Sequence, residues 1–203
     1  MQTALLLIDV QQSFQHRPYW AGLSDNDHAS FLAHLNTLVA GCTARGVPVL
    51  RIFHTDGPRQ ADNPFAPESG LIRPLDGLAP FDAAATFEKH RHSALVGTGL
   101  PVWLHQQGIS RLIVAGIRTE QCCETTTRGA SDLGFAVDFV TAATLTFLMT
   151  HASGRAFTSD EIKMRTELVL AGRFADIVSV DEALQRAAPS HGKCGSKHSG
   201  KLN

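Results

Sequence analysis

An unbroken apolar run at residues 112–117, LIVAGI, constrains the fold more than any other stretch of the chain. A strand that is apolar on both faces is typical of a parallel sheet covered by helices on both sides. The run is followed by RTEQCCE, which combines a turn with two adjacent cysteines. We therefore predict a buried strand, a tight turn and the first turn of a helix that carries Cys122 and Cys123.

Strand and helix patterns alternate along the rest of the chain. Strands are predicted at residues 4–9, 47–54, 84–87, 135–142 and 174–180, and helices at residues 27–45, 98–107, 120–133 and 158–171. This alternation predicts an α/β fold with a doubly wound, mainly parallel six-stranded sheet, order 3-2-1-4-5-6, and helices on both faces. Residues 55–80 are rich in Pro and Gly without periodicity, which predicts a functional loop such as a pocket wall.

The 203 residues fit one domain, which we place at residues 1–188. Residues 189–203 are rich in Gly, Ser and Lys, and we predict a disordered tail there. A formal net charge of −1 gives no indication of a nucleic-acid or membrane partner. We expect a small-molecule substrate instead.

The cysteine content and the N-terminal sequence indicate the cellular compartment in which the protein is expected. Four cysteines without framework spacing suggest reduced thiols. The opening MQTALLLIDV has neither the basic region nor the cleavage site of a signal peptide. We expect a soluble, cytoplasmic protein.

Three ionisable residues lie at the predicted ends of strands: Asp9, Lys89 and Cys122. In the predicted order the first and fourth strands are neighbours, so Asp9 and Cys122 should face each other. With Thr119 as N-cap, Cys122 would lie near the positive end of the helix dipole, which favours the thiolate. Asp9 could act as general base and then acid, and the Lys89 ammonium would favour both anions. The pattern predicts a hydrolase that forms a thioester on Cys122.

The two cysteines are predicted to have different roles. Adjacent helical residues point about 100° apart, so only one can face the site squarely. Cys123 shares an inward stripe with Thr126 or Thr127, Ala130 and Leu133, and we predict that it packs in the core. Cys122 remains as the reactive thiol.

Three motifs resemble the isochorismatase-like cysteine hydrolase superfamily, which includes nicotinamidases and N-carbamoylsarcosine amidases. They are ALLLIDVQQSF, FEKHRHSAL and VAGIRTEQCCETT, and the resemblance extends over residues 3–185. The residues that match the family pattern are Asp9, Gln11, Phe14, Lys89, Gly116, Thr119, Cys122 and Thr126. The chain departs from the pattern at Leu95, Cys123 and Thr141, none of which belongs to the triad.

The resemblance implies a catalytic triad of Asp9, Lys89 and Cys122. It also implies a non-proline cis peptide at Ile117–Arg118, with the N–H groups of Arg118 and Cys122 as the oxyanion hole. Nicotinamidases of the family bind a metal through an Asp-x-His pair, whereas here His54 precedes Asp56 and no second histidine is near. We therefore predict no metal and no other cofactor, and nicotinamidase activity is disfavoured.

These observations predict hydrolysis of a small-molecule amide, carbamoyl or ureido C–N bond. Two alternatives stay open: an isochorismatase-type vinyl-ether hydrolase and a non-catalytic ligand-binding relative. Phe14, Trp20, Phe53 and His54 are the predicted pocket residues. The resemblance further implies a homo-oligomer, a dimer or larger, with the 55–80 loop and a helix near residues 150–160 as candidate contacts.

Overall fold

A six-stranded parallel sheet forms the centre of the molecule in the computed structural model, which describes residues 2–187 apart from the side chains of residues 25 and 26. Its strands are β1 (Gln2–Ile8), β2 (Val49–His54), β3 (Ala85–Lys89), β4 (Ile109–Ile117), β5 (Ala136–Leu145) and β8 (Asp176–Ile177). Their order is β3-β2-β1-β4-β5-β8 and every pairing is parallel. The predicted doubly wound α/β sheet and its strand order are confirmed.

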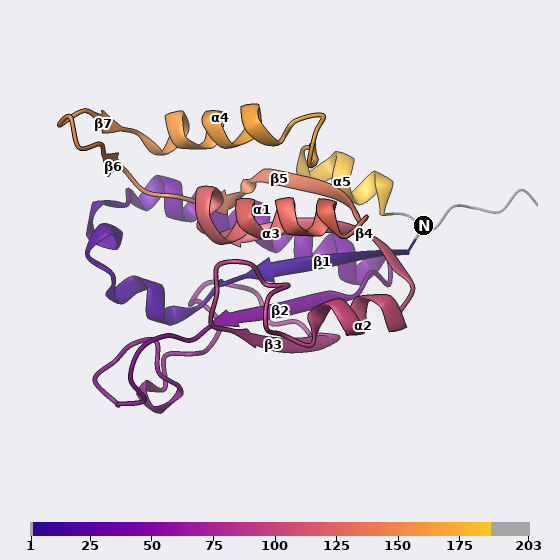
Figure 1. Ribbon diagram of the computed structural model, residues 1–203, viewed down its shortest axis with the longest axis horizontal. Helices are drawn as coiled ribbons and strands as arrows, with labels where there is room; N and C mark the ends of the chain where they lie inside the picture. The colour runs from indigo at the N-terminus through magenta and orange to yellow at the C-terminus, as the bar shows by residue number, and fades with distance from the viewer. Residues whose placement is uncertain (1, 188–203) are drawn as a thin grey trace, which may run out of the picture.

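Helices cover both faces of this sheet (Figure 1). One face packs against α1 (Asp25–Ala44) and α5 (Val180–Arg186). The other packs against α2 (Leu100–Gln106), α3 (Glu124–Asp132) and the end of α4 (Ser159–Leu170). Along β1, Leu5 and Leu7 belong to the first core, whereas Leu6 and Ile8 belong to the second. Both faces are buried, which explains the uninterrupted apolar runs in the sequence.

The segment before α4 differs from the prediction. Residues near 150–160 form a hairpin of β6 (Met149–Thr150) and β7 (Ala156–Phe157), outside the main sheet. A helix near residues 150–160 was predicted as a candidate contact, but α4 begins only at Ser159, in agreement with the helix predicted at residues 158–171, and Thr158 and Glu161 form a capping box there. The last strand is also shorter than predicted, and the predicted tail at residues 189–203 lies outside the described residues.

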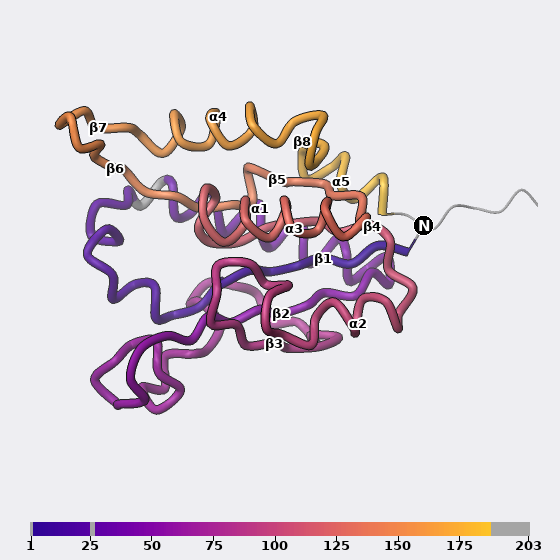
Figure 2. Tube along the Cα trace, in the orientation of Figure 1, coloured from indigo at the N-terminus to yellow at the C-terminus, as the bar shows by residue number. Residues whose placement is uncertain are grey.

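Irregular segments gather at the carboxyl ends of the strands (Figure 1). The tube in Figure 2 shows the chain after β1, the long connection between β2 and β3 and the β6–β7 hairpin on this side. The first of these contains the short 3₁₀ helices η1 (Gln12–His16) and η2 (Pro18–Gly22), and the second contains η3 (Pro67–Ser69). Within residues 2–187 no helix has both the length and the hydropathy needed to cross a bilayer.

Gly116 allows β1 and β4 to approach each other closely at this edge. It pairs with Ile8 in the register of the two strands and has a φ of 132°. A Cβ on Gly116 would lie 2.0 Å from the Ile8 carbonyl oxygen, so only glycine fits. The close approach brings the turn after β1 next to the turn after β4.

Candidate active site

Asp9 follows β1 directly, in a tight and fully buried turn. Its φ of 56° lies in the left-handed region, which Asp and Asn tolerate better than most residues. The Asp9 N–H donates to the Ile52 carbonyl (2.9 Å), and the Gln11 N–H donates to the Asp9 carbonyl (2.9 Å). These backbone bonds fix the carboxyl group at the strand end.

Gln11 ties this turn to the end of β2. Its amide oxygen accepts the His54 N–H at 2.6 Å, and its amide nitrogen donates to the His54 carbonyl at 2.8 Å. The side chain is fully buried. The motif singled out Gln11 from sequence, but its role as a link between two strand ends is visible only in the structure.

Lys89 is the last residue of β3 and is fully buried. Its Nζ lies 2.8 Å from Asp9 Oδ2 and 3.3 Å from Cys122 Sγ. A third contact, to the Arg91 carbonyl at 3.1 Å, holds the ammonium group in place. The structure therefore brings together Asp9, Lys89 and Cys122, the three residues that the sequence placed at strand ends.

Cys122 lies in a π-helical turn, Thr119–Cys123, that joins β4 to α3. The prediction of Thr119 as N-cap is wrong, because Arg118 is the cap and the Thr119 hydroxyl hydrogen bonds to the Thr144 hydroxyl at 2.8 Å. Cys123 is fully buried in the core on the α2 and α3 side of the sheet. Leu133, predicted to pack beside it, is 54% exposed because α3 ends at Asp132.

The Cys122 thiol is not predisposed to ionise. Burial raises the pKa of Cys122 above its ordinary 9.0, and the charge of Asp9 raises it further, against the opposing effect of Lys89. The prediction that the helix start favours the thiolate is therefore wrong for the resting protein. Sequence could not reveal how deeply the sulfur is buried or how near the carboxylate lies.

Asp9 and Lys89 shift each other's ionisation. Burial raises the pKa of Asp9 above 3.8, although Lys89 opposes this. Burial alone would lower the pKa of Lys89, but Asp9 and Cys122 raise it above 10.5. In the resting site a neutral thiol thus faces a basic carboxylate and a stable ammonium group.

Arg118 shapes the turn in front of Cys122. The Ile117–Arg118 peptide bond is cis, at the position implied by the family resemblance. The Arg118 carbonyl accepts the N–H groups of Gln121 (3.2 Å) and Cys123 (3.1 Å), whereas its own N–H has no backbone acceptor among residues 2–187. Its guanidinium pairs with Glu120 at 2.8 Å.

A cavity of about 500 Å³ opens in front of Cys122. Of the predicted pocket residues, Phe14 and His54 line it. Phe53 does not, because neighbouring strand residues point to opposite faces of the sheet. Trp20 does not line it either, since its ring packs on Phe147 with centroids 5.5 Å apart.

Several lining residues were not predicted from the sequence: Arg17, Tyr19, Phe65, Arg91 and Gln121. Phe65 comes from the connection between β2 and β3, and its ring meets Phe14 edge-on at 5.1 Å. This connection therefore forms one wall of the cavity. No spacing or motif distinguished these positions from other polar or aromatic loop residues.

His54 contributes a neutral imidazole to the cavity. Burial and the neighbouring Lys89 charge lower the pKa of His54 to about 4, and its Nδ1 lies 3.3 Å from Lys89 Nζ. Across the part of the chain that the structure describes, no group of three or more His, Cys, Asp or Glu side chains could hold a metal ion.

Comparison with known proteins identifies the family. The model of the isochorismatase domain matches residues 3–159. The chain belongs to the isochorismatase family. The family protein YrdC of Bacillus subtilis is 24% identical over 93% of this chain and 97% of its own length. The ureidoacrylate amidohydrolase RutB of Klebsiella pneumoniae is 24% identical over 93% of this chain and 89% of its own. The cysteine hydrolase of Pseudomonas syringae shares the fold, with a TM-score of 0.80 at 21% identity and coverage of 92% of both chains.

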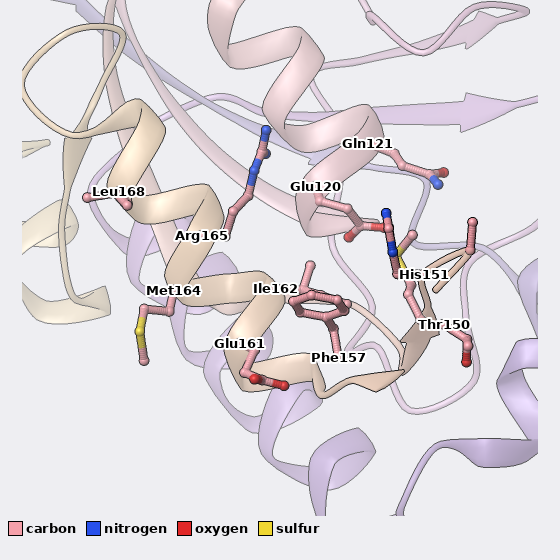
Figure 3. A pocket seen from close by; sticks show the side chains of 12 residues that line it. Glu120, Gln121, Thr150, His151, Phe157, Glu161, Ile162, Met164, Arg165 and Leu168 are labelled. Atoms are coloured by element: carbon pink, nitrogen blue, oxygen red, sulfur yellow. The ribbon is translucent and has the colours of Figure 1, made fainter. Parts of the chain in front are cut away.

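This isochorismatase-family chain also has a larger hollow, of about 830 Å³, between α4 and the β6–β7 hairpin (Figure 3). Its walls include Phe157, Ile162 and Leu168. Gln121 borders both hollows, but Cys122 lines only the smaller one, with Asp9 and Lys89 in contact behind it. We therefore place the chemistry in the smaller cavity.

Proposed function

We propose that this protein hydrolyses an amide, carbamoyl or ureido C–N bond of a small molecule, with Cys122 as the nucleophile. The observation that carries the proposal is the position of Lys89 Nζ, 2.8 Å from Asp9 Oδ2 and 3.3 Å from Cys122 Sγ. A carboxylate, an ammonium group and a thiol share one buried site beside a cavity. The name of the relative RutB, ureidoacrylate amidohydrolase, is consistent with this chemistry.

Asp9 is the general base in the first step. Because the pKa of Cys122 is raised, the thiol needs a base, and Asp9 Oδ1 has no hydrogen-bond partner among the described residues. Asp9 takes the thiol proton as Sγ attacks the substrate carbonyl carbon. The proton then passes to the leaving nitrogen, and the C–N bond breaks to leave a thioester on Cys122.

The backbone of the turn after β4 stabilises the oxyanion. We assign the Arg118 and Cys122 N–H groups as its donors, and the lack of a backbone acceptor for the Arg118 N–H within residues 2–187 supports this. Each such donor is typically worth about 3 kcal/mol to the transition state. In the second step Asp9 deprotonates a water molecule, which attacks the thioester and releases the acid and the Cys122 thiol.

Lys89 keeps the charges of the site in balance. Its ammonium group contacts both the base and the nucleophile, so it stabilises whichever of the two is anionic as the proton moves. Its raised pKa keeps it charged throughout the reaction. His54, neutral beside it, adds no second charge.

The test is ammonia or amine release from a panel of small primary amides, carbamoyl compounds and ureido compounds. Cys122→Ala should abolish release, and Cys123→Ala should keep most of it, because Cys123 is buried in the core. Trapping with a mass increase on Cys122 during turnover would identify the thioester. If Cys122→Ala retains full activity, or if only a vinyl ether is cleaved, the proposal is wrong.

A further inference from the structure

Two arginines at the cavity have no acidic partner among the residues that the structure describes. Arg17 lies directly before η2 and Arg91 follows β3, and both line the cavity that contains Cys122. In the described part of the chain, neither guanidinium forms an ion pair with a carboxylate. Arg118, the third arginine of the lining, differs because it is paired with Glu120.

Residues of the cavity itself hold both arginines in position. The Arg17 guanidinium carbon lies 4.1 Å from the centroid of the Phe65 ring, and the Arg17 N–H donates to the Phe14 carbonyl at 3.1 Å. The Arg91 carbonyl accepts Lys89 Nζ at 3.1 Å, so its backbone is tied to the proposed catalytic lysine. Stacking on an aromatic face leaves the N–H donors at the edge of the guanidinium plane available to a ligand.

The cavity therefore carries an excess of positive charge. Asp56 is the one carboxylate among its lining residues in the described chain, and its Oδ1 already accepts the Gly57 N–H at 2.8 Å. Asp9 and Lys89 neutralise each other behind the cavity. Two guanidinium groups without a carboxylate partner in the described chain thus line the cavity with a single acid, although Arg91 Nη1 also donates to the His90 carbonyl at 3.4 Å.

We propose that the substrate is a small amide or ureido compound that bears a carboxylate. Arg17 and Arg91 bind the carboxylate at the mouth while the scissile carbonyl lies at Cys122. Guanidinium groups match a carboxylate with two parallel N–H donors, and a cavity of about 500 Å³ limits the ligand to a small molecule. The statement that the bound compound is hydrolysed rests on the proposed function. The statement that the cavity prefers an anionic ligand does not.

Cys122 offers a direct measurement of that selection. Iodoacetate and iodoacetamide alkylate a thiol by the same displacement of iodide, and they differ mainly in that iodoacetate is an anion. The ratio of their rates at Cys122 cancels the thiolate fraction and reports the electrostatic environment of the cavity. Mass spectrometry of the Cys122 peptide measures this site alone, and glutathione gives the ratio for a free thiol.

We expect an iodoacetate-to-iodoacetamide ratio at Cys122 about tenfold above that of glutathione at low salt. Arg17→Gln and Arg91→Gln should each lower the ratio about threefold, and added KCl should lower it towards the glutathione value. Arg17→Lys keeps the charge and should keep most of the ratio. Arg173→Gln, an exposed arginine between α4 and β8, is the matched control and should leave the ratio unchanged.

Two results would overturn the inference: a ratio at or below that of glutathione, or a ratio unaffected by both glutamine variants. The measurement needs no turnover. A high, arginine-dependent ratio without ammonia release would refute the proposed reaction and keep the anion site. Ammonia release together with an iodoacetate-to-iodoacetamide ratio equal to that of glutathione would support the proposed reaction and refute the anion site.

Discussion

Lys89 and Asp9 form a 2.8 Å ion pair in which neither side chain is exposed to solvent. Asp9 follows β1 and Lys89 ends β3, so the pair crosses the end of β2, which lies between these strands. Taking both charges out of water is costly, and their attraction offsets that cost only while both partners are present. The pair consequently links the stability of the sheet edge to the function of the site.

Lys89→Met should therefore lower stability as well as abolish activity. The change leaves Asp9 as a buried carboxylate without a counter-charge, at a cost of about 3–5 kcal/mol in the free energy of unfolding. Urea denaturation measures this loss. The double variant Asp9→Asn/Lys89→Met should recover part of it, because no isolated charge remains. A loss below about 1 kcal/mol in the single variant would contradict the role of the pair.

The pH dependence of kcat/KM should show one limb on the acid side. Asp9 must be ionised to accept the thiol proton, and its raised pKa places the loss of activity above pH 3.8 as the pH falls. Lys89 keeps its charge up to pH values above 10.5, so it adds no alkaline limb below that point. His54, with a pKa of about 4, is neutral near pH 7.

Steady-state rates from pH 4 to 9.5 with one amide substrate check this profile. The same limb should remain in His54→Asn, which removes the titrating imidazole. A limb that moves with the His54 substitution, or activity that rises steadily with pH up to 9.5, would show that Asp9 is not the base. The second result would favour direct ionisation of Cys122.

The topology and the three reactive residues could be predicted because one geometric rule connects them. Carboxyl ends of parallel strands meet at one edge of a sheet, so residues at three strand ends must converge. The apolar run before Cys122 and the alternation of strands and helices were sufficient to locate that edge. The predicted strand order placed Asp9 opposite Cys122, whereas the family resemblance joined Lys89 to them as a triad.

Properties that depend on how deeply a side chain is buried and on how it packs against its neighbours could not be predicted from the sequence. The thiolate expectation for Cys122 used only its place near a helix start, whereas burial and the Asp9 charge dominate its pKa. The π turn, Thr119–Cys123, has no periodicity that distinguishes it from an α-helix in a short segment. Trp20 was predicted for the pocket by residue type, but the packing of its ring on Phe147 decides its place.

Gln11→Leu tests the link between the first two strand ends. The substitution leaves the N–H and carbonyl of His54 without their buried partner, which should cost about 1–3 kcal/mol of stability. We also expect kcat to fall, because His54 borders Lys89 at 3.3 Å. Urea denaturation and steady-state kinetics measure the two effects. Gln106→Leu, on the exposed side of α2, is the control and should change stability by less than about 0.5 kcal/mol.

Gly116→Ala tests the close approach of β1 and β4. The added methyl group would meet the Ile8 carbonyl oxygen at 2.0 Å, and a φ of 132° is unfavourable for alanine even without that clash. Two backbone segments cannot separate locally without disturbing the sheet, so we expect a loss of more than about 3 kcal/mol in the free energy of unfolding.

Gly134→Ala separates the two causes of that loss. Gly134 also has a positive φ, 89°, but apart from its two chain neighbours no heavy atom of the described residues lies within 4 Å of the position that its Cβ would take. Strain alone should then cost about 1–2 kcal/mol. Thermal and urea unfolding of the two variants measure the difference, and soluble yield ranks them if Gly116→Ala does not fold. Equal stability of the two variants would mean that contact with Ile8 does not require glycine at position 116.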